Sequence, residues 1–302
     1  MKLQLENILN FIEEQGQNYT YIGDKGIAVE GFCALSNLKS YCITWIKRFE
    51  NFDISAVNKE LNILFVTNTP EETSVPVGYN VIMCNDPKAV FFSILNNYWK
   101  KTQSVGIAPT AVVETTHIGR NVSIGHNCYI SPDVIIGDDV VIEHNVSIIN
   151  KAVIGDRVLI HAGARLGTDG YGYYTDINGL NQKVEHYGGI VIGADSEVGA
   201  NTCIDRGTLD DTVIGRNVKI DNLCHIAHNV KIEDNSMVIA LSLLGGSSHL
   251  KRNSYIAPGV MVINQATIGE DAYVGMGAVV VRDVPDNKLV AGVPAKILRD
   301  NK

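Results

Sequence analysis

The chain has 302 residues, enough for two domains of ordinary size, and a formal net charge of −8. This acidic balance argues against nucleic acid or an anionic membrane surface as the main partner. No apolar run approaches the roughly 18 residues that span a bilayer, and the first thirty residues lack the pattern of a secretory signal. The six cysteines form no CxxC pair, which is typical of free thiols in a reducing compartment. We therefore expect a cytoplasmic protein without membrane insertion.

Residues 1–104 are predicted to form a small α/β domain. The segment QLENILNFIEEQG (4–16) has helical periodicity, and residues 87–101 place a proline in the first turn of a second helix. The runs 61–68 and 79–86 are typical of strands.

A different pattern begins at Ile118, where an aliphatic residue recurs every six positions. A period of six predicts short strands joined by corners, and three such hexads make one coil. Residues 105–283 are thus predicted to form a mostly β structure, a parallel β-helix of hexapeptide repeats. The repeat is interrupted by an inserted loop at 167–189 and slips by four residues at DRGTLDDT (205–212). The tail, 284–302, is predicted to be a loop with at most a short helical turn.

The coil makes a chemical prediction at IDNLCHIAHNV (220–230). The repeat indicates no slip between residues 208 and 280, so Asp210, His228 and Gly246 are expected to stack about 5 Å apart. A carboxylate beneath an imidazole fixes its tautomer, and a glycine above it leaves a backbone N–H open to a developing oxyanion. The pattern predicts a general base for attack of an amine on a thioester. The alternative is that His228 is a corner residue satisfied by its neighbours.

Two other histidines occupy the same place in successive coils. His126 and His144 are three hexads apart, so their rings are expected to stack in a structural or subunit-contact role. No HxH or histidine–carboxylate spacing supports a metal site, and none is predicted. Asp205 and Arg206 are interpreted as an ion pair that pins the slip.

The hexads resemble the left-handed β-helix acyltransferases. GTDGYGY (167–173), VGANTCIDRGTLDDTVIG (198–215) and IDNLCHIAHNV are similar to the UDP-3-O-acylglucosamine N-acyltransferase family of the lipid A pathway, over residues 1–280. The resemblance implies left-handed coils, a homotrimer, and acyl transfer to a nucleotide-linked amino sugar. Two departures stand out. Gln265 replaces the family's second active-site histidine, and the chain ends AGVPAK (291–296), as in hexapeptide sugar acetyltransferases that use acetyl-CoA.

The resemblance also implies roles for further residues. Gln265 could help to hold an oxyanion but cannot titrate, so no second proton-transfer role is expected there. Three groups of residues are candidates for binding: for the sugar, Tyr171, Tyr173, His186, Asp221, Asn222 and His225; for a pyrimidine base, Tyr41, Trp45 and Phe49; for acyl-CoA, Gly275, Gly277, Ala278, Gly292 and Lys296. Each has a structural alternative: packing of the loop on a neighbouring subunit, hydrogen bonding within the coil, or packing in a core.

The predicted function is transfer of an acetyl or short hydroxyacyl group from acyl-CoA to the amine of a dTDP- or UDP-linked amino sugar, in surface glycan synthesis. Acyl-CoA serves as a co-substrate, and no tightly bound cofactor is expected. One alternative is the lipid A enzyme with an acyl carrier protein as donor. Others are a non-catalytic sugar-binding solenoid and a metal-dependent hydratase.

Overall fold

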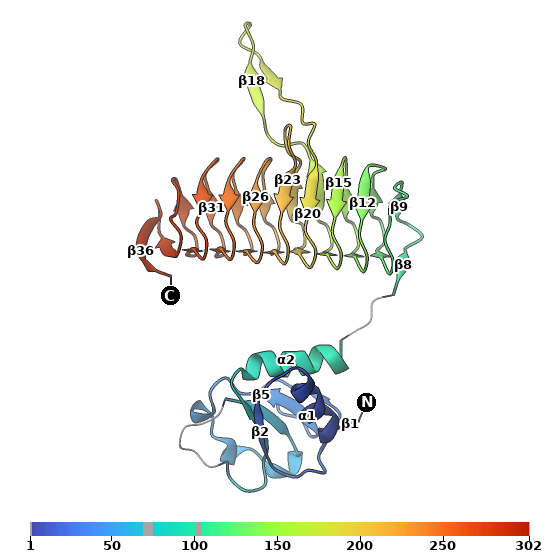
Figure 1. Cartoon of the computed structure of the whole chain (residues 1–302), viewed down its shortest axis with the longest axis vertical. Coiled ribbons are helices and arrows are strands. Elements are labelled where there is room, and N and C mark those ends of the chain that lie inside the picture. Colours follow the sequence, from blue (N-terminus) through green and yellow to red (C-terminus); the bar gives the residue numbers. More distant parts are fainter. Residues whose placement is uncertain (1, 69–74, 101–103, 302) are drawn as a thin grey trace. The chain divides into compact units, whose positions relative to one another are not determined.

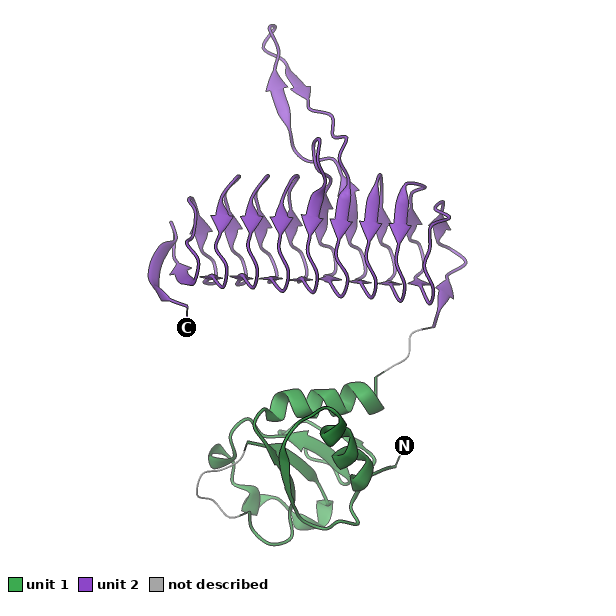
Figure 2. Cartoon of the chain, viewed as in Figure 1, with its two compact units in different colours: residues 1–102 green, residues 103–302 purple. Residues whose placement is uncertain are grey.

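The computed structural model describes residues 2–68, 75–100 and 104–301. The chain divides into two compact units, Met1–Thr102 and Gln103–Lys302 (Figure 2). Each unit has its own hydrophobic core.

The first unit contains a five-stranded sheet in the order β2-β7-β6-β5-β4, in which only β2 runs antiparallel to its neighbour. Both predicted helices and both predicted strands are confirmed. The side chain of Asp86 caps the second helix by accepting a hydrogen bond from the Ala89 N–H. The elements are β1 (Leu3–Gln4), α1 (Leu5–Glu14), β2 (Tyr19–Ile22), β3 (Ala28–Val29), β4 (Gly31–Phe32), β5 (Cys42–Trp45), β6 (Leu64–Thr67), β7 (Asn80–Cys84), α2 (Pro87–Tyr98) and 3₁₀ turns at Phe49–Asn51, Ile54–Ala56 and Lys59–Leu61.

The second unit is a solenoid of short strands stacked coil upon coil (Figure 1). The expected parallel β-helix is confirmed, and strands of successive coils pair in parallel at an offset of three hexads, as in Ser123 with Val141. The first sheet contains β8 (Gly106–Ile107), β10 (Ser123–Ile124), β13 (Val141–Ile142), β16 (Leu159–Ile160), β21 (Glu197–Val198), β24 (Lys219–Ile220), β27 (Met237–Val238), β30 (Tyr255–Ile256), β33 (Tyr273–Val274), β35 (Lys288–Ala291) and β36 (Lys296–Asp300).

Two further sheets complete the prism. The second sheet contains β9 (Val112–Val113), β11 (Tyr129–Ile130), β14 (Ser147–Ile148), β17 (Arg165–Thr168), β22 (Cys203–Asp205), β25 (His225–Ile226), β28 (Leu243–Leu244), β31 (Met261–Val262) and β34 (Val279–Val280). The third sheet contains β12 (Val134–Ile136), β15 (Ala152–Ile154), β20 (Ile190–Ile192), β23 (Thr212–Ile214), β26 (Lys231–Ile232), β29 (His249–Leu250) and β32 (Thr267–Ile268).

The periodic aliphatic side chains fill the axis of the prism. Ile226, Leu244 and Val238 are all fully buried there. Many corners turn through a residue with positive φ, often asparagine, such as Asn229 at φ +60°. Asparagine tolerates this left-handed conformation better than most residues. The sequence thus specifies both the core and the corners of each coil.

Both departures from the repeat occur where the second sheet turns into the third, a position we call the second corner. The inserted loop leaves it after β17 and forms an arm with the hairpin β18 (Tyr173–Thr175) and β19 (Asn181–Lys183), which projects from the solenoid (Figure 1). In the next coil Cys203 pairs with His225, and the distance along the sequence between them is four residues longer than three hexads. Val213 pairs with Lys231, which is again three hexads away. The four extra residues therefore lie between these two pairs.

The tail differs from the predicted loop. Strand β35 continues the first sheet beside β33, and β36 folds back against β35 as an antiparallel hairpin. This hairpin covers the last coil and satisfies backbone groups that would otherwise be left at the sheet edge. Among the helices that the structure describes, none has the length and apolar character needed to cross a bilayer.

Candidate functional site

The site is built around His228, which follows strand β25 at the second corner. A Cβ atom placed on Gly246 would lie 2.8 Å from Nε2 of His228, so this glycine sits directly over the imidazole. The predicted stacking of His228 and Gly246 is confirmed. The regular offset of three hexads holds here because β25 and β28 are in register, with His225 opposite Leu243.

The tautomer of His228 is set by its neighbour Asn229. Nδ1 of His228 lies 2.9 Å from Oδ1 of Asn229, which also accepts hydrogen bonds from the Thr208 hydroxyl at 2.9 Å and the Thr208 N–H at 3.2 Å. Because an amide oxygen only accepts, the proton of the neutral imidazole must reside on Nδ1. Nε2 therefore presents its lone pair toward Gly246, as a general base requires.

The prediction that Asp210 orients His228 is wrong. The slip is not complete before residue 208, so the regular offset of three hexads does not apply to this pair. Thr208 lies beneath the ring instead, with its hydroxyl 3.4 Å from Nδ1. Asp210 is exposed, and its backbone carbonyl packs so closely against Gly207 that any side chain there would collide with it.

Gly246 offers a second chemical group, its backbone N–H. At the corners that follow the third sheet, the corresponding N–H groups of Arg120, Asp138 and Arg216 donate to a carboxylate of the next coil at 2.7–2.9 Å. Among the described residues, no hydrogen bond is formed by the N–H of Gly246. It is thus a free donor beside the basic nitrogen, where the oxyanion of an acyl transfer would develop. Gln265 is exposed in the following coil, and its N–H donates to the Gly246 carbonyl at 2.9 Å.

A buried carboxylate lies beneath this corner. Asp205 ends strand β22 with its side chain 8% exposed. Oδ1 accepts a hydrogen bond from the Thr168 hydroxyl at 2.9 Å, and Oδ2 lies 3.6 Å from Nε2 of His225. Burial raises the pKa of the Asp205 carboxyl, while the imidazoles of His225, His228 and His186 act in the opposite direction. The interpretation of Asp205 as the ion-pair partner of Arg206 missed this cluster.

His186, at the base of the arm, belongs to the same cluster. Its ring lies edge-on to His228, with 5.4 Å between ring centroids. Nδ1 of His186 is 2.9 Å from the Val184 carbonyl oxygen, while Nε2 is buried without a hydrogen-bond partner in the described structure. Gly170 allows the arm to pack over both rings, since a Cβ there would fall 2.6 Å from Cδ2 of His228. The arm therefore forms one wall of the site.

Other predicted sugar-binding residues have different surroundings. Tyr171 and Tyr173 lie further out on the arm, with ring centroids 4.9 Å apart and Tyr171 89% exposed. Asp221 and Asn222 lie at a different corner, where their side chains accept hydrogen bonds from the N–H groups of Ala240 and Ala200. Hydrogen bonding within the coil accounts for Asp221 and Asn222.

The predicted base-stacking residues in the first unit are only partly available. Phe49 is 4% exposed within a core cluster, so its proposed contact with a nucleobase is wrong. Trp45 packs partly against the other core and lies 6.3 Å from Phe92 between ring centroids. Tyr41 is exposed and remains a candidate.

The predicted acyl-CoA residues lie in the last coil and in the tail that covers it. Ala278 is fully buried in the core, so its side chain cannot line a channel. Gly275 is required for packing, because a Cβ there would lie 2.9 Å from that of Ala291 in β35. Gly277 faces open space and Gly292 turns the hairpin at φ +96°. Lys296 lines a cavity of about 300 Å³ that also contains Arg282.

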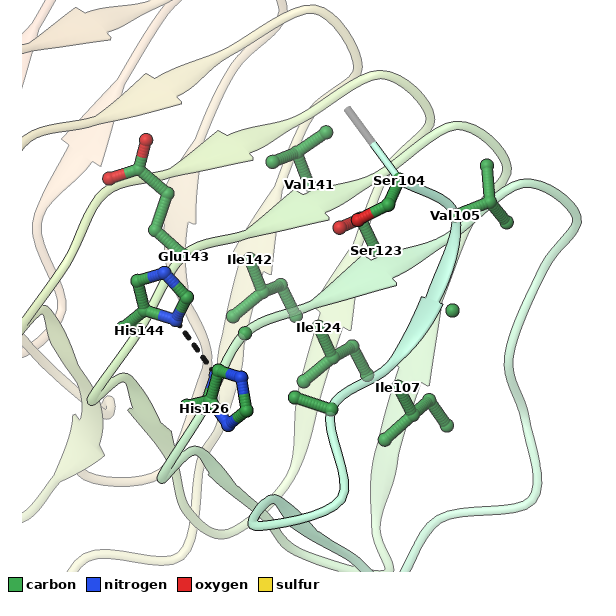
Figure 3. Close-up of a pocket in the computed structure, with 13 residues that line it drawn as sticks. Ser104, Val105, Ile107, Ser123, Ile124, His126, Val141, Ile142, Glu143 and His144 are labelled. Atoms are coloured by element: carbon green, nitrogen blue, oxygen red, sulfur yellow. Dashed lines mark hydrogen bonds between the residues drawn. The ribbon is translucent and has the colours of Figure 1, made fainter. Parts of the chain in front are cut away.

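A separate groove of about 560 Å³ lies on the first coils, with His126 and His144 side by side at its end (Figure 3). Their predicted stacking is confirmed, with ring centroids 5.5 Å apart, and the His126 N–H donates to Nδ1 of His144 at 2.8 Å. Across the described ranges, no group of three histidine, cysteine or acidic side chains is arranged to hold a metal ion.

The repeats place this solenoid in a known class. Residues 115–150, 136–168 and 211–245 match the model of the bacterial transferase hexapeptide, a family of six-residue repeats. The expected resemblance to hexapeptide-repeat acyltransferases is confirmed at this level. Solved structures agree in fold: a UDP-N-acetylglucosamine acyltransferase from Campylobacter jejuni is 25% identical with a TM-score of 0.58, covering 65% of this chain and 75% of that one.

Relatives found by sequence carry names that specify an acceptor. A protein of Methylobacterium nodulans named UDP-3-O-acylglucosamine N-acyltransferase is 41% identical over 149 residues, which are 49% of this chain and 42% of the relative. UDP-3-O-acylglucosamine N-acyltransferase 2 of Legionella pneumophila is 52% identical over 100 residues, 33% of this chain and 29% of that protein. This chain thus spans less than half the length of the curated relatives it matches.

Proposed function

We propose that this protein transfers an acyl group from a thioester to the amino group of a UDP-linked glucosamine. The observation that carries the proposal is the pairing of a bare imidazole nitrogen, Nε2 of His228, with the free N–H of Gly246 above it. Acyl transfer to an amine needs these two groups side by side, a base and an oxyanion donor. The names of the similar proteins support UDP-3-O-acylglucosamine as the acceptor.

The reaction follows from the geometry of the corner. Nε2 of His228 removes a proton from the amine as its nitrogen attacks the thioester carbonyl. Asn229 holds the Nδ1 proton and so stabilises the imidazolium that forms, although as a neutral group it does so less strongly than a carboxylate. The Gly246 N–H binds the carbonyl oxygen as it becomes negative, and we assign an assisting role to Gln265 in the next coil. Direct transfer requires no covalent intermediate on the enzyme.

The acyl donor has two candidates, an acylated carrier protein and acyl-CoA. The second is supported by the tail, where a cavity is lined by two cationic side chains, Arg282 and Lys296, and one carboxylate, Asp283. If acyl-CoA is the donor, the protein would transfer an acetyl or short hydroxyacyl group to a dTDP- or UDP-linked amino sugar for surface glycans. The names of the relatives favour the 3-O-acylated glucosamine acceptor over that reading.

Assembly into a homotrimer is part of the proposal. The arm carries exposed apolar side chains, among them Ile177 at its tip and Leu180. An isolated two-stranded hairpin is only marginally stable in water, so contact with a second copy would stabilise the arm and enclose the site. We place the reaction in the cytoplasm, as predicted from the sequence.

A thiol-release assay tests the function. The purified protein would receive UDP-3-O-acylglucosamine, UDP-glucosamine or dTDP-linked amino sugars, together with acetyl-CoA, 3-hydroxybutyryl-CoA or a 3-hydroxyacyl carrier protein. His228→Ala is expected to lower turnover by about a hundredfold or more. His249→Ala is the matched control, because His249 is an imidazole on the third sheet with its own carboxylate partner, Glu233 at 2.8 Å. Absence of turnover with every pair would favour a non-catalytic, sugar-binding solenoid.

A further inference from the structure

The mechanism above leaves the buried pair of Asp205 and His225 without a task. Taking a carboxylate out of water is costly, and apolar side chains at such a position are often equally stabilising or better. The fold nevertheless keeps Asp205 inside, with one oxygen held by Thr168 and the other facing His225. A buried carboxyl with a raised pKa beside an exposed imidazole is an arrangement typical of functional sites.

His225 presents the other half of the pair to the outside. Its side chain is 44% exposed, and Nε2 is the nitrogen nearest the Asp205 carboxylate. Nδ1 has no hydrogen bond within the described structure and is free to meet a ligand. In the outward column of the second sheet, His225 lies between Cys203 in one coil and Leu243 in the next.

This column adjoins the site of acyl transfer. Only two residues separate His225 from His228, so an extended chain places their Cα atoms at most about 10 Å apart. Beyond His225 the column becomes apolar, with Leu243 and Met261 both exposed. An acyl or pantetheine arm lying on these side chains would bring the thioester between His225 and the Gly246 N–H.

We propose that His225, positioned by Asp205, is the general acid that protonates the departing sulfur of the thioester. This step rests on the proposed acyl transfer. The amine nitrogen forms the new C–N bond and gives its proton to His228. The C–S bond then breaks with its electron pair on sulfur, which takes a proton from Nδ1 of doubly protonated His225. Exchange with solvent returns both imidazoles to their starting states.

The surroundings of His225 suit an acid. Asp205 and Cys203 of β22 lie beside His225, and the imidazoles of His186 and His228 are close enough to Asp205 to lower the pKa of its carboxyl against the effect of burial. Asp205 can hold the imidazolium while leaving its outer nitrogen free. Asn264 and Gln265, which lie above the corner, carry amides that cannot act as general acids, so we assign this step to the exposed imidazole of His225.

The leaving group provides the test. The acceptor is UDP-3-O-acylglucosamine, and the donors are the 3-hydroxybutyryl thioesters of N-acetylcysteamine and of thiophenol. An alkyl thiolate is a poor leaving group that benefits from an acid, whereas an aryl thiolate departs without one. His225→Gln is expected to lower kcat/KM by at least about tenfold with the alkyl thioester and by less than about threefold with the aryl thioester. The positioning variant Asp205→Asn should show the same selectivity, and His249→Gln should change neither rate.

The outcomes separate the two proposals. If wild-type protein transfers the acyl group and His225→Gln slows both donors equally, His225 binds or supports the fold, and the acid role is wrong. The same conclusion follows if neither donor is slowed. If wild-type protein fails with both donors and with the carrier-protein and CoA donors above, the acyl transfer itself is wrong and the acid role falls with it. Thermal melting of each variant identifies a loss caused by unfolding.

Discussion

Substituting Gly246 by alanine tests the arrangement of base and oxyanion donor directly. The added methyl group would lie 2.8 Å from Nε2 and 2.9 Å from Cε1 of His228, whereas ordinary Cβ contacts begin at 3.4 Å. The imidazole must therefore retreat by about 0.6 Å, the difference between 3.4 and 2.8 Å. A misplacement of about 1 Å can reduce a rate by about a hundredfold, so we expect kcat/KM to fall by roughly 10- to 100-fold.

The assay is thiol release over a range of acceptor concentrations, combined with thermal melting. Gly246 does not require a left-handed backbone, so Gly246→Ala should keep its melting temperature while it loses activity. Gly31→Ala in the first unit is the control, since a Cβ atom there would make an ordinary contact of 3.8 Å with Sγ of Cys42. Wild-type kcat/KM in a folded Gly246→Ala protein would refute the assignment of His228 and Gly246 to one reaction centre.

Three other predictions follow from contacts elsewhere in the solenoid. Asn229→Gly keeps the left-handed corner but removes the acceptor for Nδ1 of His228, so kcat/KM should fall at least about tenfold. Asn229→Asp keeps an oxygen at that position and should retain most activity. Equal rates in the two variants would contradict the assignment of the Nδ1 tautomer. Burial lowers the pKa of His161, but the hydrogen bonds of its imidazole with Glu197 at 2.7 Å and with Glu143 outweigh burial and raise the pKa above 6.5. The protonated imidazole therefore contributes fully to stability below pH 6.5, and this contribution is lost as the pH rises through the raised pKa. Denaturant unfolding of wild type and His161→Gln from pH 5 to 9 should show the decline only in wild type. Leu244→Ala removes a fully buried side chain from the axis and should lower the free energy of unfolding by about 2–5 kcal/mol in urea titrations; a change under about 1 kcal/mol would mean that the coil collapses around the cavity.

The sequence predicted the coil, the interrupted register and the contact between His228 and Gly246, because a six-residue period fixes which side chains enter the core. It could not show where within 205–212 the four extra residues are absorbed. That choice depends on backbone conformation at one corner, and it moved Thr208 rather than Asp210 beneath the imidazole. Asn229 was missed for a related reason, since its side chain reaches His228 only because the corner turns with positive φ.

Asp205 shows a second limit of pattern reading. In the sequence it stands beside Arg206, and adjacent opposite charges suggest an ion pair. In a strand, successive side chains point to opposite faces, and Nε of Arg206 donates instead to the Gly188 carbonyl oxygen at 2.6 Å. The alternation along β22 could have raised this possibility, but the histidine partner comes from the next coil and depends on the lengthened offset that pairs Cys203 with His225.

The concentration of irregularity at one corner has a consequence for how such proteins diversify. In a solenoid each coil contacts only the coils on either side of it. The arm, the four-residue slip, His228 and Gly246 occupy successive coils, while the coils toward the tail carry the proposed donor surface. The tail-side coils could therefore be exchanged between related solenoids wherever the boundary preserves the spacing of three hexads. Such an exchange could give a new acyl preference without disturbing the residues proposed to bind the amine.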